Sequence, residues 1–458
     1  MDVLTNTISQ FVSKLGFQDL PAQSLQWIKG GFLDTISTTL SGSQLESTLI
    51  AKQVAHLNSI SPVQNLMGCT LIGQDLRAEP MTAALINGTA AHAELFDDNS
   101  APMIAHPSSP IVSALLPLAE IYSLSGKELI TAYAAGFEVS VALGRASNPQ
   151  MYEKGWHVTR SLGILGATAA CCKLLKLSEI QIQSAMGIAA SMASGVRQNF
   201  GTMTMALHVG LTARDAIHCA LLAKHGFLSA PDALSGQFGY FNCFRGMNID
   251  SVELGTEFEL LRSGIIFKPY PSGAPTHAAI ECALTIRKSL GTHSQDIESV
   301  ICHVHPWNAM TLKDGEVHDT LRARVSLKFC LAVAIRFGKV SSTHFTMQTI
   351  NDLEIKALMA KILIQIDGQL PDNGLFPARL RVNLISGASV EHQIDIPPGS
   401  PQRGWSIDEA REKLENCAKG ILQPDQTEEI INTISDLENT KNIRELCHLL
   451  ESRPINPS

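Results

Sequence analysis

Up to about residue 265 the chain consists of long segments rich in Ala, Leu, Ile, Met and Gly, with few alternating runs of β-branched residues. This pattern restricts the region to a helical fold. Capping boxes at Ser125 and Ser178 predict helices that extend through Ala146 and to about Gly195. Small residues dominate both segments and permit close helix approach, so we expect a dense bundle with buried helices.

From residue 266 the residue pattern changes. Prolines and a glycine are concentrated in a short loop, and patterns typical of strands follow a further helical stretch. A short Gly-containing connection at 386–389 predicts a hairpin, and a capping box at Ser406 predicts a return to helix through the C-terminus. We therefore predict a mainly α protein with an inserted α+β domain: a helical bundle from residues 1–265 and 402–458, and a smaller α+β lid from 266–401. The predicted strands are Ile297–His305, Leu363–Ile366, Leu380–Leu384 and Val390–Ile396.

Composition restricts the partners. The 458 residues carry 35 Lys and Arg against 43 Asp and Glu, a formal charge of −8, and have no basic run, so neither nucleic acid nor an anionic membrane is an expected partner. The N-terminus lacks the pattern of a secretory signal, and no apolar stretch has the length of a membrane span. We expect an intracellular, cytoplasmic protein with a small-molecule ligand. Its ten cysteines form no CxxC pair and are expected to be reduced, with Cys171 and Cys172 in the core.

Four histidines lie in Gly-, Pro- or Ser-rich surroundings rather than in helical patterns: His106, His157, His208 and His277. Imidazole has the unperturbed pKa best suited to proton transfer near neutral pH, so loop histidines at helix starts are candidates for general acid or base. Each of them taken singly is also explained by a capping or hydrogen-bonded structural role. Only their number favours a site.

The segment after His106 resembles a helix N-terminus with Pro110 at its first position, which would place the histidine beside exposed N–H donors that can bind an anion. Asp97 and Asp98 precede it by about ten residues. They are interpreted either as groups that orient an imidazole or as plain solvated loop charges. Both interpretations stay open at this stage.

A polar loop at 199–204, ending in Thr204, allows backbone N–H groups to approach a ligand, although it lacks the spacing of a phosphate-binding loop. Arg160, Arg197 and Lys268 lie beside these motifs, and such cations can fix a substrate carboxylate. The pair His303 and His305 lies on a predicted strand with no evident acidic or thiol partner, which argues against a metal there.

With these residues in view, the sequence resembles the MmgE/PrpD family. No single motif is decisive, but the order of the motifs makes a chance match improbable. The matching segments are 92–98, 106–109, 155–157 with 162–167, 187–191, 199–204, 207–208, 271–277, 326–331 and 398–401.

The resemblance implies an enzyme that needs no cofactor and no metal, is usually a homodimer, and acts on small di- or tricarboxylates by proton transfer next to a carboxylate. It also implies a site in the cleft between a helical domain and a lid. The histidines that match the decarboxylase branch are His106, His157 and His277, and Lys268 matches a basic residue near the substrate. A carbanion-like intermediate needs such a base, an acid and cations that hold the carboxylates.

Two positions depart from the family pattern. The family commonly has a lysine two residues before the Leu-His pair that ends in His208, and this chain has Met205 there; Leu95 replaces a common aspartate. Loss of a cation in a substrate pocket changes its charge and polarity, so we expect a less charged or bulkier substrate.

Three hypotheses follow. The first is a lyase, either a decarboxylase or a dehydratase, in which His106 and His157 share proton transfer and His277 assists. Lys268 and Arg160 would anchor the substrate, whose further contacts would be Asp97, Asp98, Thr204, Met205 and His208. The second is an epimerase or isomerase of a dicarboxylate, which uses the same groups to remove and return one proton. The third is a family member without catalysis that acts as a binding protein.

Overall fold

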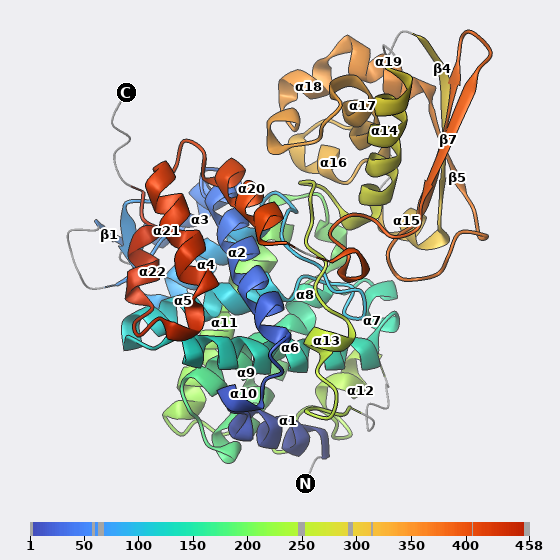
Figure 1. The fold of residues 1–458 in the computed structure, drawn as a ribbon. Helices are drawn as coiled ribbons and strands as arrows, with labels where there is room; N and C mark the ends of the chain where they lie inside the picture. The colour runs from blue at the N-terminus through green and yellow to red at the C-terminus, as the bar shows by residue number, and fades with distance from the viewer. Residues whose placement is uncertain are drawn as a thin grey trace. The chain divides into compact units, whose positions relative to one another are not determined.

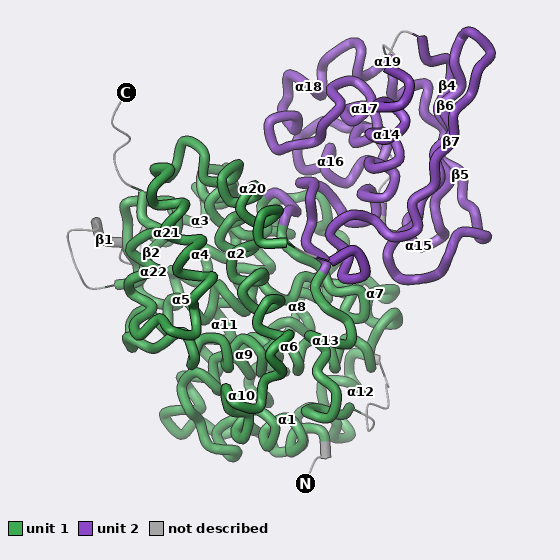
Figure 2. Tube along the Cα trace, viewed as in Figure 1, with its two compact units in different colours: residues 1–93, 97–265, 406–458 green, residues 94–96, 266–405 purple. Residues whose placement is uncertain are grey.

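The computed structural model describes residues 3–56, 60–62, 68–245, 252–291, 296–312, 315–404 and 406–452. The chain is mostly helical with a small sheet region, as the sequence predicts (Figure 1). It divides into two compact units (Figure 2). Unit 1 comprises Met1–Ala93, Asp97–Ile265 and Ser406–Ser458, and unit 2 comprises Glu94–Phe96 and Ile266–Trp405.

Unit 1 is built from helices whose starts follow the predicted capping signals. The side chains of Ser125, Ser178 and Ser406 accept hydrogen bonds from the third residue of α6, α10 and α20, and each box is reciprocal. Helix α10 ends at Met192, slightly before the predicted end. The helices of unit 1 are α1 Val3–Lys14, α2 Ser24–Gly42, α3 Glu46–His56, α4 Pro80–His92, α5 Ser108–Tyr122, α6 Gly126–Ser147, α7 Gln150–Glu153, α8 Val158–Ser161, α9 Gly163–Leu174, α10 Glu179–Met192, α11 Met203–Lys224, α12 Tyr240–Arg245, α13 Glu259–Arg262, α20 Ile407–Ala418, α21 Pro424–Ser435 and α22 Arg444–Leu449.

Glycines set the close packing of these helices. A Cβ on Gly166 of α9 would lie 2.7 Å from the Gly136 carbonyl oxygen of α6, and a Cβ on Gly210 of α11 would lie 2.2 Å from the Leu85 carbonyl oxygen of α4. No side chain fits at either crossing. The small residues therefore bring backbones into contact, in agreement with the predicted dense packing.

A three-stranded antiparallel sheet in unit 1 was not predicted. Its strands are β1 Ile60–Pro62, β2 Cys69–Thr70 and β3 Leu76–Ala78, in the order β1-β3-β2. Strands of two or three residues are too short to show alternation. Arg77 of β3 is buried and donates to Glu120 of α5 at 2.8 Å, which joins the sheet to the bundle.

Unit 2 contains a four-stranded sheet in the order β5-β4-β6-β7, with β4 and β5 parallel and the other pairs antiparallel. All four predicted strands are present, and β6 and β7 form the predicted hairpin. Helix α14 packs on β6 and β7, and α17 packs between α14 and α19. The elements of unit 2 are α14 His277–Leu290, β4 Ile297–Val304, α15 Pro306–Thr311, α16 Thr320–Arg324, α17 Leu327–Phe337, α18 Met347–Asn351, α19 Leu353–Lys361, β5 Ile362–Ile366, β6 Ala378–Leu384 and β7 Ser389–Ile394.

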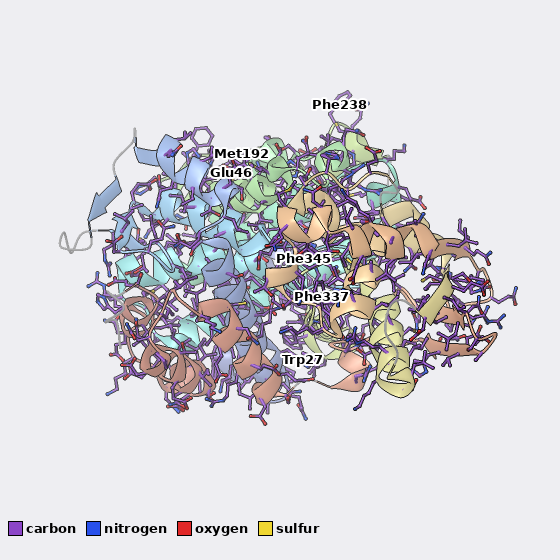
Figure 3. All side chains as sticks on the ribbon, turned by 90° about the horizontal axis from the view of Figure 1, so that it is seen from above. Trp27, Glu46, Met192, Phe238, Phe337 and Phe345 are labelled. Atoms are coloured by element: carbon purple, nitrogen blue, oxygen red, sulfur yellow. The ribbon has the colours of Figure 1, made fainter. Side chains whose placement is uncertain are left out.

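The short segment Glu94–Phe96 belongs to unit 2 because of a buried ion pair. Arg324 donates to Glu94 Oε1 at 2.8 Å, and Ser342 donates to Glu94 Oε2 at 2.7 Å. The guanidinium also lies 4.6 Å from the ring centre of Phe345, which Figure 3 labels. Breaking a buried pair of this kind is costly, so it fixes this segment firmly to unit 2.

Candidate active site

Four histidines from separate elements of unit 1 lie close together. His92 is the last residue of α4, His106 precedes α5, His157 is the N-cap of α8, and His208 lies in α11. The ring centres of His92 and His106 are 4.5 Å apart, those of His92 and His157 are 5.8 Å apart, and those of His157 and His208 are 5.1 Å apart.

The prediction that His208 lies outside a helical pattern is wrong. Helix α11 begins at Met203, directly after its N-cap Thr202, and so includes His208. Met203, Met205 and Ala206 are good helix formers, and their preference outweighs the nearby glycines.

The orientation of His106 is defined by its backbone and by one ring nitrogen. Its backbone N–H donates to Thr159 Oγ1 at 3.1 Å, and its Nδ1–H donates to the Asp98 carbonyl oxygen at 2.6 Å. Because a carbonyl oxygen can only accept, Nδ1 carries the proton. The neutral ring therefore carries its lone pair on Nε2. The side chain is 12% exposed, so a ligand can approach it.

Asp97 and Asp98 are both fully buried, and the interpretation as solvated loop charges is wrong. His92 Nδ1–H donates to Asp97 Oδ1 at 2.9 Å, while Ser109 Oγ donates to Asp97 Oδ2. The structure thus favours the other interpretation, in which a carboxylate orients an imidazole.

The start of α5 also differs in detail from its prediction. The helix begins at Ser108 after the N-cap Pro107, so Pro110 is its third residue and not its first. The anion at this N-terminus is the Asp98 carboxylate of the protein itself, which accepts from the Ser108 N–H at 3.3 Å and from the Ser108 hydroxyl. Burial, followed by the nearby Asp34, raises the pKa of Asp98 well above its usual value.

His157 and His208 form a direct imidazole pair with a distance of 2.9 Å between their Nδ1 atoms. One Nδ1 must donate and the other must accept, so the two neutral rings hold opposite tautomers. Burial is the main cause that lowers both pKa values, with contributions from neighbouring histidines. The pKa of His157 lies well below its usual value, and that of His208 falls to about 4. Both rings are therefore neutral at pH 7.

Contacts with the segment after α10 position His157. Its backbone N–H donates to the Gly195 carbonyl oxygen at 3.0 Å, and the ring of Phe200 lies edge-on at 4.9 Å between centres. Gly195 has φ +96°, and a Cβ there would lie 2.8 Å from the Arg160 side chain. Glycine is therefore required at position 195, where the segment after α10 passes close to α8.

Arg160, a predicted carboxylate anchor, is buried and ion-paired inside unit 1. Its Nη2 donates to Asp215 Oδ2 at 2.5 Å and to the Met192 carbonyl oxygen at 3.0 Å, and its Nε donates to Ser194 Oγ at 3.2 Å. These contacts join α8 to α10 and α11. Arg160 thus holds the helix that His157 caps.

The polar loop at 199–204 forms the entry to α11. Thr204 is exposed in the first turn of this helix, and Met205 beside it is buried. Arg197, two residues before the loop, donates to the Tyr152 carbonyl oxygen at 2.6 Å, and its guanidinium lies 3.6 Å from the Tyr152 ring centre.

The remaining predicted residues lie in unit 2 and are described within it. Lys268 is buried and donates to the Leu95 carbonyl oxygen at 2.7 Å. His277, the first residue of α14, is buried, with Nε2 3.4 Å from the Ser272 carbonyl oxygen and its ring edge-on to Tyr270 at 5.4 Å. Their roles toward a substrate stay predictions.

His92 is the residue to which sequence reasoning assigned no role. It is 1% exposed, and among the residues that the structure describes its Nε2 finds no hydrogen-bond partner. The available signal was its position five residues before Asp97, at the end of a helix. One ligand atom each from His92, Asp97 and His106 lies within 4.8 Å of the other two, so this group could hold a metal ion.

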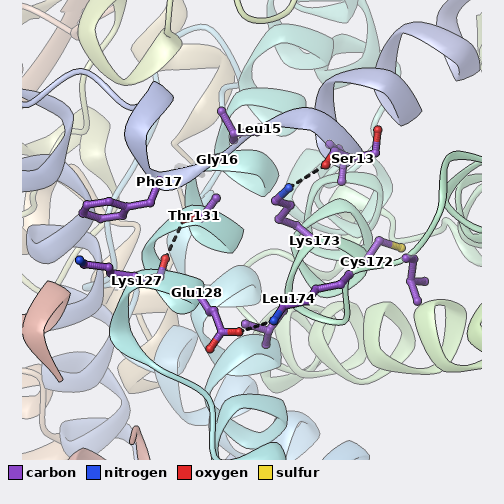
Figure 4. A pocket seen from close by; sticks show the side chains of 13 residues that line it. Ser13, Leu15, Gly16, Phe17, Lys127, Glu128, Thr131, Cys172, Lys173 and Leu174 are labelled. Carbon is purple, nitrogen blue, oxygen red and sulfur yellow. Dashed lines mark hydrogen bonds and ion pairs between the residues drawn. The ribbon is translucent and has the colours of Figure 1, made fainter. Parts of the chain in front are cut away.

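A separate pocket of about 390 Å³ lies at the ends of α1, α6 and α9 (Figure 4). Two of its three lysines are engaged within the protein: Lys173 donates to the Ser13 carbonyl oxygen at 2.9 Å, and Lys176 pairs with Glu128 at 2.7 Å. None of the predicted site residues lines this pocket.

In the described part of the chain, no helix has the length and apolar character needed to cross a membrane.

Family models match both parts of the sequence. The MmgE/PrpD N-terminal domain matches residues 6–250, and the MmgE/PrpD C-terminal domain matches residues 270–439.

Curated relatives match over nearly the whole chain at low identity. Cis-aconitate decarboxylase of Homo sapiens is 26% identical, covering 98% of this chain and 94% of the relative. Cis-aconitate decarboxylase of Aspergillus terreus is 27% identical, covering 98% and 96%. The 2-methylcitrate dehydratase of Salmonella typhimurium is 24% identical over 44% of each chain.

Proposed function

The chain belongs to the MmgE/PrpD family, and from this premise we propose that it is a lyase that decarboxylates or dehydrates a small di- or tricarboxylate-like substrate by proton transfer next to a carboxylate. Relatives named as a decarboxylase and a dehydratase support this reaction class. In this proposal the reaction needs no cofactor, as the resemblance implies.

The observation that carries the proposal is the buried histidine cluster in unit 1. The ring centres of His106 and His157 lie 4.5 Å and 5.8 Å from that of His92, and hydrogen bonds constrain the tautomers of all three rings. A general base must be neutral at the working pH and must present a lone pair in a defined direction. The His106 ring, protonated at Nδ1, offers its lone pair at Nε2, and the neutral His157 ring is paired with His208.

The two histidines divide the chemistry in this proposal. In a dehydration, one accepts the proton from the carbon next to the substrate carboxylate, and the other donates a proton to the hydroxyl that leaves as water. In a decarboxylation, the C–CO₂ bond breaks and one of them donates a proton to the carbon from which CO₂ has left. When His157 Nδ1–H is the donor of the Nδ1–Nδ1 hydrogen bond, the Nε2 of His157 has the lone pair that takes up a proton, and the Nδ1 proton can then be shared with His208. Asp97, through His92, and the Asp98 carbonyl, through His106, keep the rings in place.

The proposed substrate is less charged or bulkier than a typical tricarboxylate. Met205 supplies an apolar side chain in the first turn of α11, where the family commonly has a lysine, and it is only 3% exposed. Arg160 is already paired with Asp215, so within unit 1 its contribution is to position His157. The proposed contacts of Lys268 and His277 with substrate are carried over from the resemblance.

Proton NMR in D₂O with a panel of small di- and tricarboxylates tests the proposal. We expect deuterium to enter next to a carboxylate and product signals to appear, with loss of both in His106→Gln and His157→Gln. His218→Gln is the matched control, because His218 is an exposed histidine of α11. Exchange that persists unchanged in both site variants would refute the assignment of these residues.

Product mass separates the reaction classes. Loss of CO₂ or water supports the lyase, whereas exchange of one hydrogen without change of mass identifies an epimerase. Silence across the whole panel, in folded protein, would favour a binding protein without catalysis.

A further inference from the structure

We propose that the ion pair of Asp34 and Lys413 positions the histidine cluster of unit 1, because it holds the backbone of Asp98, whose carbonyl oxygen orients His106. The two residues act through Asp98 and are positioning residues rather than catalytic ones. The inference rests on the proposed function only for its effect on turnover, because the state of the His106 ring is measured without a substrate.

The ion pair joins two helices, α2 and α20, that pack against each other in unit 1 (Figure 1). Asp34 of α2 is 4% exposed, and Lys413 lies on the same face of α20 as the buried Ala410 and Leu414. Lys413 Nζ donates to Asp34 Oδ1 at 2.6 Å. Well-packed apolar side chains hold two helices together at least as well as a buried ion pair does, so stability alone does not account for these charges.

The two oxygens of Asp34 have different partners. Oδ1 accepts from Lys413, while Oδ2 accepts from the backbone N–H of Asp98 at 2.9 Å. A carboxylate has two acceptor oxygens and no donor, so it serves an ammonium and a peptide N–H together. Burial raises the pKa of Asp34, and Lys413 is the largest influence that lowers it, so the ammonium favours the ionised form.

Asp98 transmits this restraint to the site. Its N–H is held by Asp34, and its carbonyl oxygen accepts from His106 Nδ1–H at 2.6 Å. Its carboxyl group accepts from the backbone N–H and the hydroxyl of Ser108. Asp98 is therefore restrained at three points, and the contact with Asp34 is the one that ties this loop to α2.

The peptide group that Asp34 holds also joins Asp98 to Asp97, whose carboxylate accepts from His92. A rotation of this peptide would therefore displace the partners of both His92 and His106. Proton transfer depends on such placement, and a shift of about 1 Å in a positioned group can cost about 100-fold in rate. Loss of the Lys413 charge should consequently lower turnover without weakening substrate binding to the same extent.

Lys413→Met tests the inference, because methionine keeps an unbranched apolar side chain and removes the ammonium. Histidine-selective ¹⁵N NMR of the full chain reads the His106 tautomer, and the loss of a signal in His106→Gln assigns it. We expect the Nδ1–H tautomer in the wild type, a mixture of both tautomers in Lys413→Met, and the wild-type spectrum in Lys413→Arg, which keeps the charge.

A second variant and a matched control make the test specific. Asparagine has one acceptor oxygen where aspartate has two, so Asp34→Asn should disturb the His106 tautomer as Lys413→Met does. Lys29→Met is the control, because Lys29 also lies in α2 and pairs with Glu438 at 2.6 Å. The side chains of Lys29 and Lys413 are 16% and 10% exposed. Lys29→Met should leave the His106 spectrum unchanged.

Turnover gives the second readout, on whichever carboxylate the D₂O panel identifies as substrate. Lys413→Met should lower kcat about 10- to 100-fold with KM changed less than about 3-fold, and Lys413→Arg should restore kcat. If no carboxylate turns over, the proposed function fails, whereas the His106 tautomer still decides this inference.

Circular dichroism and thermal melting establish that each variant is folded. Two results would overturn the proposal: a folded Lys413→Met variant whose His106 tautomer matches the wild type, or an equal change of the tautomer in Lys29→Met.

Discussion

Replacing His208 by glutamine should make unit 1 less sensitive to acid. In the folded protein His208 is buried against His157, and its pKa is lowered to about 4. In the unfolded chain the value is about 6.5. The unfolded state therefore binds more protons between these values, so the wild-type protein loses stability as the pH falls from 7 toward 4.

The magnitude follows from the two pKa values. For a single group that titrates at about 6.5 unfolded and about 4 folded, the loss between pH 7 and pH 5 is at most about 2 kcal/mol. Partial solvent screening reduces this figure, and we expect about 1–2 kcal/mol from His208. His157, whose pKa is also lowered, contributes in the same direction.

Urea unfolding at pH 7 and pH 5 measures the effect. Glutamine can still hydrogen-bond His157 Nδ1 but does not titrate, so His208→Gln should lose about 1–2 kcal/mol less than the wild type over this range. His218→Gln is the control on the exposed face of α11 and should behave like the wild type. An identical pH dependence in His208→Gln and wild type would refute the reasoning.

Three further predictions concern packing, charge and specificity. Gly210→Ala should destabilise unit 1 by about 1–3 kcal/mol in urea, because its Cβ would meet the α4 backbone at 2.2 Å. Gly163→Ala, with its nearest atoms at 3.8 Å, should be neutral or stabilising by up to about 1 kcal/mol; equal losses in both variants would contradict the packing argument. Asp215→Asn should cost about 3–5 kcal/mol in the same assay by leaving Arg160 buried without its charge partner, and a loss below about 1 kcal/mol would show that the pair is dispensable. Met205→Lys should raise turnover of tricarboxylates in the NMR assay, and unchanged turnover would remove this position from the specificity argument.

Helix starts and strands were predictable because their signals are local. The capping boxes at Ser125, Ser178 and Ser406 each occupy four consecutive residues, and the strands of unit 2 are long enough to show alternation. The short strands in the first hundred residues carry no such signal, and they were missed. The helical position of His208 was missed because nearby glycines suggested a loop.

The sequence by itself determined that the region up to about residue 265 is helical, that an α+β region follows, and which residue types are able to transfer protons. Only the tertiary structure decided how these residues are arranged. The pairing of His157 with His208, 51 residues apart, and of Arg160 with Asp215, 55 residues apart, depends on the packing of α8 against α11. Burial then sets the protonation of these groups, and burial is a property of the packed chain and not of any local motif.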